Sequence, residues 1–347
     1  MQSLDNRDVD LKLMKFEIYR DANAFQSLAD DWNELLNRSV TCTPFLSIEW
    51  ISTWWNIFEP GELLILTCRL EDDRLIGIAP CFITSESDQR TLVLVGCEDI
   101  TDYLDFLIDK DHQEAAYLGL SQILLEHQNE FDQIDFCNIP SESPTRSRFA
   151  ALLTEADLVV SEDVQEVCPI IQLPDSWDAY LQLLNKKQRH EVRRKLRRID
   201  NEPLDVQYER LNDSNALDES MTTFFELMRK SDPKKATFLE DEKNVQFFRE
   251  IATLFFDKGI LNLNFLKIEG KAVATYMNFD FNNDILVYNS GLDYDDYGHL
   301  SAGIVLLCHD IKDAIQKERS VFNFLRGDEV YKYRMGGEDT YIYYLRT

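Results

Sequence analysis

The sequence predicts an α/β protein built from two similar lobes, each a mixed, largely antiparallel sheet flanked by helices. The chain has 347 residues, more than a single domain usually holds. Its hydrophobic fraction of 44% is enough to bury a large core. Stretches with the two-residue period of strands alternate with stretches of helical period, and the same order of elements occurs twice. This repeated order suggests an internal duplication.

The first lobe is expected over residues 1–167. It begins with a strand and two helices, continues with a meander of strands, and closes with a helix, a buried strand and a further helix. The expected elements are strands at 14–20, 63–70, 75–83, 91–96 and 133–139, and helices at 25–38, 43–58, 114–128 and 148–156.

The second lobe is expected over residues 204–347, and a connector at 168–203 joins the two. The helical pattern of the connector begins at Ser176 and continues through a strongly basic segment. The elements expected in the second lobe are strands at 204–211, 261–268, 272–281, 284–292, 321–327 and 340–347, and helices at 220–231, 244–259 and 301–317.

Charge and cysteine usage restrict the class of protein. The formal net charge is −27, which in general repels nucleic acid and anionic lipid. The seven cysteines form no CxxC pair, which favours a reducing compartment over a disulfide framework. The N-terminal segment lacks the apolar core of a signal peptide, and no apolar run approaches the roughly 20 residues that span a membrane. We therefore expect a cytoplasmic protein without integral membrane association.

The basic segment KKQRHEVRRKLRR (186–198) stands out in so acidic a chain. Eight of its thirteen residues are Lys or Arg. Val192, Leu196 and Ile199 form an apolar stripe along the predicted helix, and its polar face is almost wholly cationic. Like charges spaced four residues apart destabilise a helix. Three interpretations remain open: the helix packs against the acidic body of the protein, it binds an anion such as a nucleotide phosphate or an acidic acceptor, or it binds RNA, which the acidic surface disfavours.

A second cluster of charged residues follows the strand pattern near the C-terminus, in FNFLRGDEVYKYRMGG (322–337). Open α/β folds place their chemistry just beyond the ends of central strands. The cluster therefore predicts a functional site, with a solvated loop as the alternative. Within nine residues it contains Arg326, Asp328, Glu329, Tyr331, Lys332 and Arg334.

This cluster resembles the "DFLRGDExYKxxW" string of the GNAT acyltransferase superfamily, in the CelD-like branch associated with cellulose and exopolysaccharide biosynthesis. That branch is related to the FemAB peptidyltransferases. Further segments resemble the motifs of this branch in the same order. They are TPFLSIEWISTWW (43–55), LIGIAPCF (75–82), DYLDFL (102–107), NKKQRHEVRRKLRRI (185–199) and GKAVATYMNF (270–279).

The resemblance implies two GNAT-like lobes and transfer of an acyl group from acyl-CoA, as co-substrate, to an amine such as an amino sugar or amino lipid. In this chemistry a base removes a proton from the attacking amine, and an acid returns one to the departing thiolate. Asp328 or Glu329 is the expected base, and Tyr331 or Tyr288 the expected acid. Arg326 and Lys332 are expected to contact an anionic group of donor or acceptor, and no metal is expected.

The donor pyrophosphate is expected at the N-terminus of the helix that begins near Ser301, since helix N-termini bind anions. Gly303 allows close backbone approach there, whereas Asp295 and Asp296 oppose an anion. Cationic side chains of the basic segment are expected to supply the missing positive charge, namely Arg193, Arg194 and Arg197.

The matching loop of the first lobe contains Asp102, Tyr103 and Asp105, which are expected either to line a substrate-binding cleft or to form a structural turn. Two alternative functions remain. One is a FemAB-like transferase that uses aminoacyl-tRNA, which the −27 charge disfavours. The other is a non-catalytic GNAT-like protein that binds or scaffolds in polysaccharide assembly.

Overall fold

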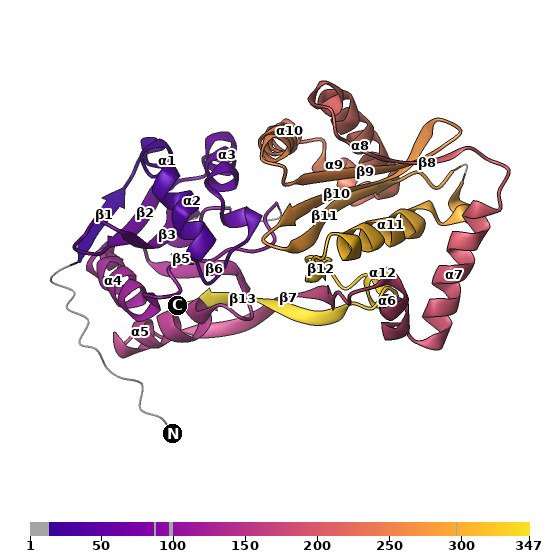
Figure 1. Ribbon diagram of the computed structural model, residues 1–347. Coiled ribbons are helices and arrows are strands. Elements are labelled where there is room, and N and C mark those ends of the chain that lie inside the picture. The colour runs from indigo at the N-terminus through magenta and orange to yellow at the C-terminus, as the bar shows by residue number, and fades with distance from the viewer. Residues whose placement is uncertain (1–13, 87, 97–99, 296) are drawn as a thin grey trace. The chain divides into compact units, whose positions relative to one another are not determined.

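The computed structural model describes residues 14–86, 88–96, 100–295 and 297–347, and these form two compact units (Figure 1). The first unit comprises Met1–Glu166 and Tyr341–Thr347, and the second comprises Val167–Thr340. The expected connector, 168–203, thus belongs to the second unit, whereas the end of the chain belongs to the first. Within the described residues, no helix is both long and apolar enough to cross a membrane.

The first unit contains a mixed sheet with helices on its faces. Neighbouring strands are antiparallel except β4 and β6, which are parallel. In spatial order the strands are β1 (Lys15–Tyr19), β2 (Glu62–Arg69), β3 (Leu75–Glu86), β4 (Gln89–Leu94), β6 (Gln133–Pro140) and β13 (Glu338–Arg346), with the short β5 (Leu107–Ile108) paired to β3. The helices are α1 (Asn23–Ser27), α2 (Ala29–Arg38), α3 (Ile48–Phe58), α4 (Gln113–Glu126) and α5 (Ala150–Glu155).

The second unit repeats this plan. Its strands pair antiparallel except β11 and β12, which are parallel. In spatial order they are β7 (Ser161–Gln172), β12 (Val321–Asn323), β11 (Asp284–Leu292), β10 (Lys271–Phe281), β9 (Leu261–Ile268) and β8 (Val206–Arg210). The helices are α6 (Trp177–Leu183), α7 (Lys186–Asp200), α8 (Leu217–Ser231), α9 (Pro233–Phe238), α10 (Glu242–Asp257), α11 (Ala302–Gln316) and α12 (Val330–Arg334).

Helices cover both faces of the second sheet. Helices α8 and α10 pack on one face, and α11 lies along the other against β9, β10 and β11 (Figure 1). The inner face of α11 is apolar and includes Val305, Leu306 and Ile311, all buried. Burial of such side chains contributes roughly 1.5–3 kcal/mol each, so α11 is held firmly against the strands that end at the site described below.

Strands β11 and β12 diverge after a short common stretch. They pair only where Asp284–Leu286 lies beside Val321–Asn323, after which β11 continues to Leu292 without β12 as a neighbour. The register of β11 with β10 also shifts at Tyr288, since Asn278 lies opposite Val287 and the preceding Met277 lies opposite Asn289. A bulge of this kind bends the strand and interrupts its ladder. The divergence leaves open space at the ends of these two strands.

The predicted α/β fold class is confirmed, and three local predictions need correction. β7, α9 and α12 were not predicted. The continuous helix expected from Ser176 is broken at Leu184, because Asn185 is extended and its side chain caps α7 by accepting from the Gln188 N–H at 2.9 Å. In addition, Cys137 is disulfide-bonded, which the sequence did not indicate.

Candidate active site

A cavity of about 420 Å³ lies in the second unit beside the diverging ends of β11 and β12. Its walls come from the end of β11, the first turn of α11, the segment before and within α12, helix α9 and one residue of α7. Ligand sites in α/β folds commonly lie in the crevice beyond the carboxyl ends of strands. The cavity is therefore the candidate active site.

The N-terminus of α11 forms one wall. Ser301, the residue before the helix, has φ of 58° in the left-handed region, and its side chain makes no capping hydrogen bond. Its hydroxyl instead accepts from the Lys195 ammonium at 2.6 Å. A side chain at Gly303 would lie 2.6 Å from Leu292. The glycine lets α11 approach β11 closely at the cavity wall.

Lys195 of α7 is a site residue that the sequence analysis missed. Its ammonium contacts Ser301 and lines the cavity at the start of α11. Burial, together with the neighbouring Arg194, lowers its pKa. The position follows from helix geometry, since Lys195 is three residues after Val192 and four before Ile199, both of which are buried. The sequence pattern that could have indicated this site residue is a lysine near the apolar stripe of an otherwise cationic helix.

The three arginines expected to hold the donor lie elsewhere on α7. Arg193 and Arg197 are exposed, and the Arg197 guanidinium bonds to the Arg193 carbonyl at 3.3 Å. Arg194 pairs with Glu191 at 2.6 Å. None of the three lines the cavity. The same helix does contribute positive charge at the start of α11, but through Lys195.

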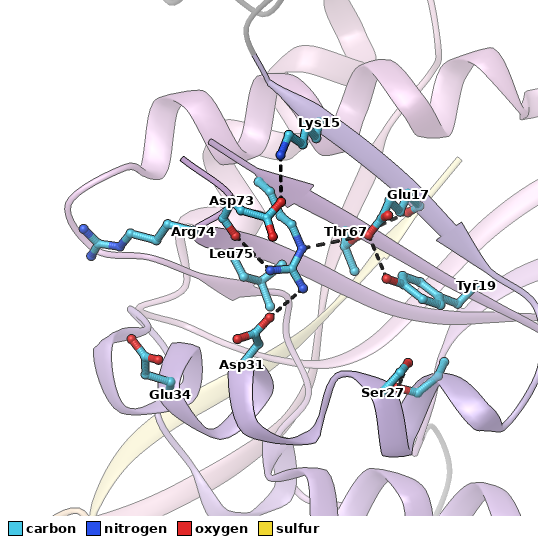
Figure 2. A network of polar contacts seen from close by, with 12 residues as sticks. Lys15, Glu17, Tyr19, Ser27, Asp31, Glu34, Thr67, Asp73, Arg74 and Leu75 are labelled. Atoms are coloured by element: carbon cyan, nitrogen blue, oxygen red, sulfur yellow. Dashed lines mark hydrogen bonds and ion pairs between the residues drawn. The ribbon is translucent and has the colours of Figure 1, made fainter. Parts of the chain in front are cut away.

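The contrast with arginines of the first unit is marked. Figure 2 shows a polar network of the first unit that includes Glu17, Asp31 and Asp73. The Arg69 guanidinium lies 2.7 Å from an Asp31 carboxylate oxygen, 3.9 Å from Glu17 and 2.9 Å from the Asp73 carbonyl. On α7, within the part of the chain that the structure describes, only Arg194 has a carboxylate partner. Lys195 and Arg198 of this helix instead donate to the Ser301 hydroxyl and the His299 carbonyl.

The charged cluster after β12 forms another wall, and Lys332 has an unexpected place in it. This side chain is 2% exposed and donates to the carbonyls of Leu325, Arg326 and Gly327 at 3.1, 2.5 and 3.1 Å. Three acceptors use all three protons of the ammonium. Lys332 therefore fixes the turn before α12, and its expected contact with a substrate anion stays a prediction.

Of the two carboxylates proposed as base, only Glu329 lines the cavity. It also lies 2.9 Å from the Lys332 ammonium, which holds it at the end of the turn. Asp328 is exposed and is not part of the cavity wall. Arg326 is partly buried and contributes its carbonyl to Lys332.

Of the two tyrosines proposed as acid, only one lines the cavity. Tyr331 lines the cavity, and burial raises its pKa well above the usual value. Tyr288 is the bulge residue of β11 and stacks on Phe279 with ring centroids 5.0 Å apart. It does not line the cavity and fits a packing role.

Lys235 of α9 is the second site residue that the sequence analysis missed. Its ammonium donates to the Ser290 carbonyl on β11 at 2.7 Å and lies 3.3 Å from the Ser290 hydroxyl. Burial lowers its pKa to about 8. Nothing in the DPKK sequence indicates which way this side chain points, because the docking of α9 decides it.

The three candidate residues of the first unit are buried there and take no part in this cavity. Asp102, Tyr103 and Asp105 are 7%, 6% and 2% exposed. The Asp105 carboxylate accepts from the Thr145 hydroxyl and the Phe106 N–H at 2.5 and 2.8 Å, and burial raises its pKa. Asp105 thus fits the structural alternative that the sequence left open.

A second cavity of about 400 Å³ adjoins the first and shares Lys195, Ile304 and Tyr331 with it. Its remaining walls come from α7 and the end of α12, and include Lys187 and Arg334. The first cavity is lined by Glu329 and the first turn of α11, and the second by residues of the cationic helix. Such an arrangement suits a long anionic molecule with one reactive end.

Comparison with known proteins agrees with this geometry. Residues 186–333 match the acetyltransferase (GNAT) domain. The GNAT match includes α7, α11, Glu329 and Tyr331, and it does not distinguish the CelD-like branch. None of the curated proteins matches the chain.

The GNAT-like fold extends over both units. The crystal structure of FemX aligns with a TM-score of 0.63 at 11% identity, over 95% of this chain and 96% of that one. L-PGS from Bacillus licheniformis aligns with a TM-score of 0.54 at 10% identity, over 91% and 90%. A tandem GNAT protein from the clavulanic acid biosynthesis pathway aligns with a TM-score of 0.50 at 10% identity, over 95% and 98%. The chain therefore has the fold of two GNAT-like lobes in tandem.

Proposed function

We propose that the protein is an N-acyltransferase that moves an acyl group from acyl-CoA to an amine acceptor. The observation that carries the proposal is the cavity itself, which joins the first turn of α11 and Lys195 at one end to Glu329 at the other. The GNAT domain match over 186–333 supports the same chemistry. An amino sugar or amino lipid is the proposed acceptor class.

The unpaired N–H groups of the first turn of α11, together with the Lys195 ammonium, suit the pyrophosphate of the donor. Glu329 is the proposed base that takes the proton of the attacking amine. Its side chain is 56% exposed, and the Lys332 ammonium at 2.9 Å orients the carboxylate. The acyl carbon would lie between these groups.

Titration calorimetry with acetyl-CoA and a long-chain acyl-CoA, followed by an assay of CoA release, tests the proposal. We expect binding of at least one donor and release of CoA that depends on an added amine. Glu329→Gln should lower turnover by about 10²–10⁴-fold, the usual contribution of a general base. Asp328→Asn, at the exposed neighbouring position, is the matched control and should stay within about threefold of wild type. Equal losses in both variants would contradict the assignment of Glu329.

A second candidate is transfer from an aminoacyl-tRNA, and α7 is the observation that favours it. Arg193 and Arg197 are exposed and lack carboxylate partners within the described residues. This candidate predicts salt-sensitive RNA binding whose log–log slope becomes shallower by about 0.7 for each phosphate contact removed. RNA binding without CoA binding would favour it over the acyl-CoA proposal.

A further inference from the structure

Lys235 has a position that a structural role alone does not require. Helix α9 begins after Asp232, whose carboxylate accepts from the Lys234 N–H at 2.7 Å, and its proline at the first position suits a helix start. The helix holds Lys235 so that its ammonium meets the Ser290 carbonyl at 2.7 Å on the cavity wall. Any neutral donor would satisfy that carbonyl, and it would avoid the cost of removing a charge from water.

The surroundings of Lys235 contain charges of both signs. The carboxylates of Asp232 and Glu329 favour its charged form, whereas the Lys332 ammonium opposes it. Burial outweighs these influences, so the pKa of Lys235 falls to about 8. Glu329 and Tyr331 line the same cavity. Lys235 is therefore an amine that can gain or lose a proton near neutral pH beside the proposed base.

We infer that the Lys235 ammonium, held against the Ser290 carbonyl in this cavity, donates the proton that the departing thiolate needs during acyl transfer. The inference rests on the proposed acyl transfer. In that step the acceptor nitrogen forms a bond to the acyl carbon, and the carbon–sulfur bond breaks with its electron pair on sulfur. One proton passes from the amine to Glu329 and one from Lys235 to sulfur. Proton exchange with solvent then restores the carboxylate and the ammonium.

Tyr331, one of several tyrosines that line the cavity and the acid expected from the sequence, is a poorer donor. Burial and the Glu329 charge raise the pKa of its phenol above the usual value. An ordinary thiol has a pKa of about 8.5, so a phenol would have to give up its proton uphill. The pKa of Lys235, about 8, nearly matches that of the thiol. Proton transfer is most efficient when donor and acceptor are matched in this way.

The leaving group provides a direct test. Wild type, Lys235→Met and Lys235→Arg are compared with acetyl-CoA and with an aryl thioester, whose thiolate leaves without a proton. Lys234→Met, on the exposed adjacent position of α9, is the matched control. We expect Lys235→Met to lose about 10²–10³-fold in turnover of acetyl-CoA and less than tenfold with the aryl thioester. A merely structural role would lower both rates equally, and that result would overturn the inference.

Lys235→Arg separates proton donation from electrostatics, because a guanidinium keeps the charge but does not give up its proton. We expect it to remain slow with acetyl-CoA and near wild type with the aryl thioester. Recovery of acetyl-CoA turnover in Lys235→Arg would show that charge alone suffices and would contradict proton donation. Circular dichroism and thermal unfolding of each variant verify that it is folded.

The pH profile gives an independent readout. With an acceptor amine that is neutral across the range, wild-type kcat/KM should fall as pH rises through about 8, since the protonated form of Lys235 is required. This fall of kcat/KM at high pH should be absent in Lys235→Met and present in Lys234→Met. Wild type that cleaves neither thioester would contradict the proposed function and the inference with it. If wild type is active and Lys235→Met shows the same fall of kcat/KM at high pH, the inference alone is contradicted.

Discussion

In the first unit the Arg69 guanidinium lies among the oxygens of Asp31, Glu17 and Asp73, three residues labelled in Figure 2. Only 11% of the Arg69 side chain is exposed. In the second unit the cations of α7 extend from a helix of the same chain, and Arg194 is the one among them that pairs with a described carboxylate. The two regions contain the same type of side chain in opposite electrostatic surroundings.

The difference is informative because carboxylates are abundant. The chain has 63 acidic and 36 basic residues, so a basic side chain readily finds an acidic neighbour. An arginine such as Arg69 stabilises the fold through such partners. A helix whose cations stay uncompensated beside a cavity instead retains positive charge for an external anion. We therefore expect arginines such as Arg69 to contribute mainly to stability, and the cations of α7 to contribute mainly to ligand binding.

The largest expected effect concerns stability in the first unit. Arg38 lies 2.8 Å from the Asp109 carboxylate, which is 0% exposed. We expect Arg38→Met to lower the free energy of unfolding by about 3 kcal/mol, since it leaves a buried charge with weaker compensation. Urea unfolding measures the change. Arg20→Met, at the exposed pair with Glu130, is the control and should cost less than about 1 kcal/mol. Equal losses would contradict the distinction between buried and exposed pairs.

A buried charge of the second unit is held by neutral amides, and it should make stability depend on pH. The Asp310 carboxylate accepts from the Asn264 and Asn278 amides at 2.9 Å each, and burial raises its pKa to about 7. Because the folded-state pKa lies above the unfolded value, this group favours folding most at low pH, and that contribution is lost as pH rises from about 4 to 7.

We therefore expect the free energy of unfolding of wild type to fall by about 2 kcal/mol more than that of Asp310→Asn between pH 5 and pH 7. Urea unfolding at the two pH values measures the difference. Parallel pH dependence in the two proteins would show that Asp310 has an ordinary pKa in the folded state.

Lys195 should affect binding and leave stability nearly unchanged. We expect Lys195→Met to weaken acyl-CoA binding by about 10–100-fold, the contribution of a hydrogen bond to a charged group. The unfolding free energy should change by less than about 1 kcal/mol, because the variant also avoids desolvation of the amine. Calorimetric titration and urea unfolding measure the two effects. If Lys195→Met binds acyl-CoA as tightly as wild type does, Lys195 of α7 does not contribute to donor binding.

The smallest effect is expected for the exposed arginines of α7. Arg193→Met/Arg197→Met should weaken acyl-CoA binding less than about threefold near 0.15 M salt and somewhat more at low ionic strength, because exposed charges are screened. Titrations at two salt concentrations measure this. A loss larger than that of Lys195→Met would restore these arginines as the main donor contacts.

Much of the fold follows from patterns along the chain. The periods of 2 and 3.6 residues place nearly all the strands and helices, and their repeated order indicates two similar lobes. The exceptions have local causes. The short β12 ends at Asn323 because the chain turns where Lys332 binds three successive carbonyls. That contact is made by a folded turn and has no signature in the periodicity.

By itself, the sequence determined the two lobes, the basic helix α7 and the charged cluster that contains Glu329 and Tyr331. Only the tertiary structure decided which of the charged side chains enter the cavity. Packing of Val192 and Ile199 turns Lys195 toward Ser301, and the docking of α9 carries Lys235 to β11. The physical reason is that residue type and spacing specify a local conformation, whereas the direction of a side chain depends on surfaces that meet only when the chain has folded.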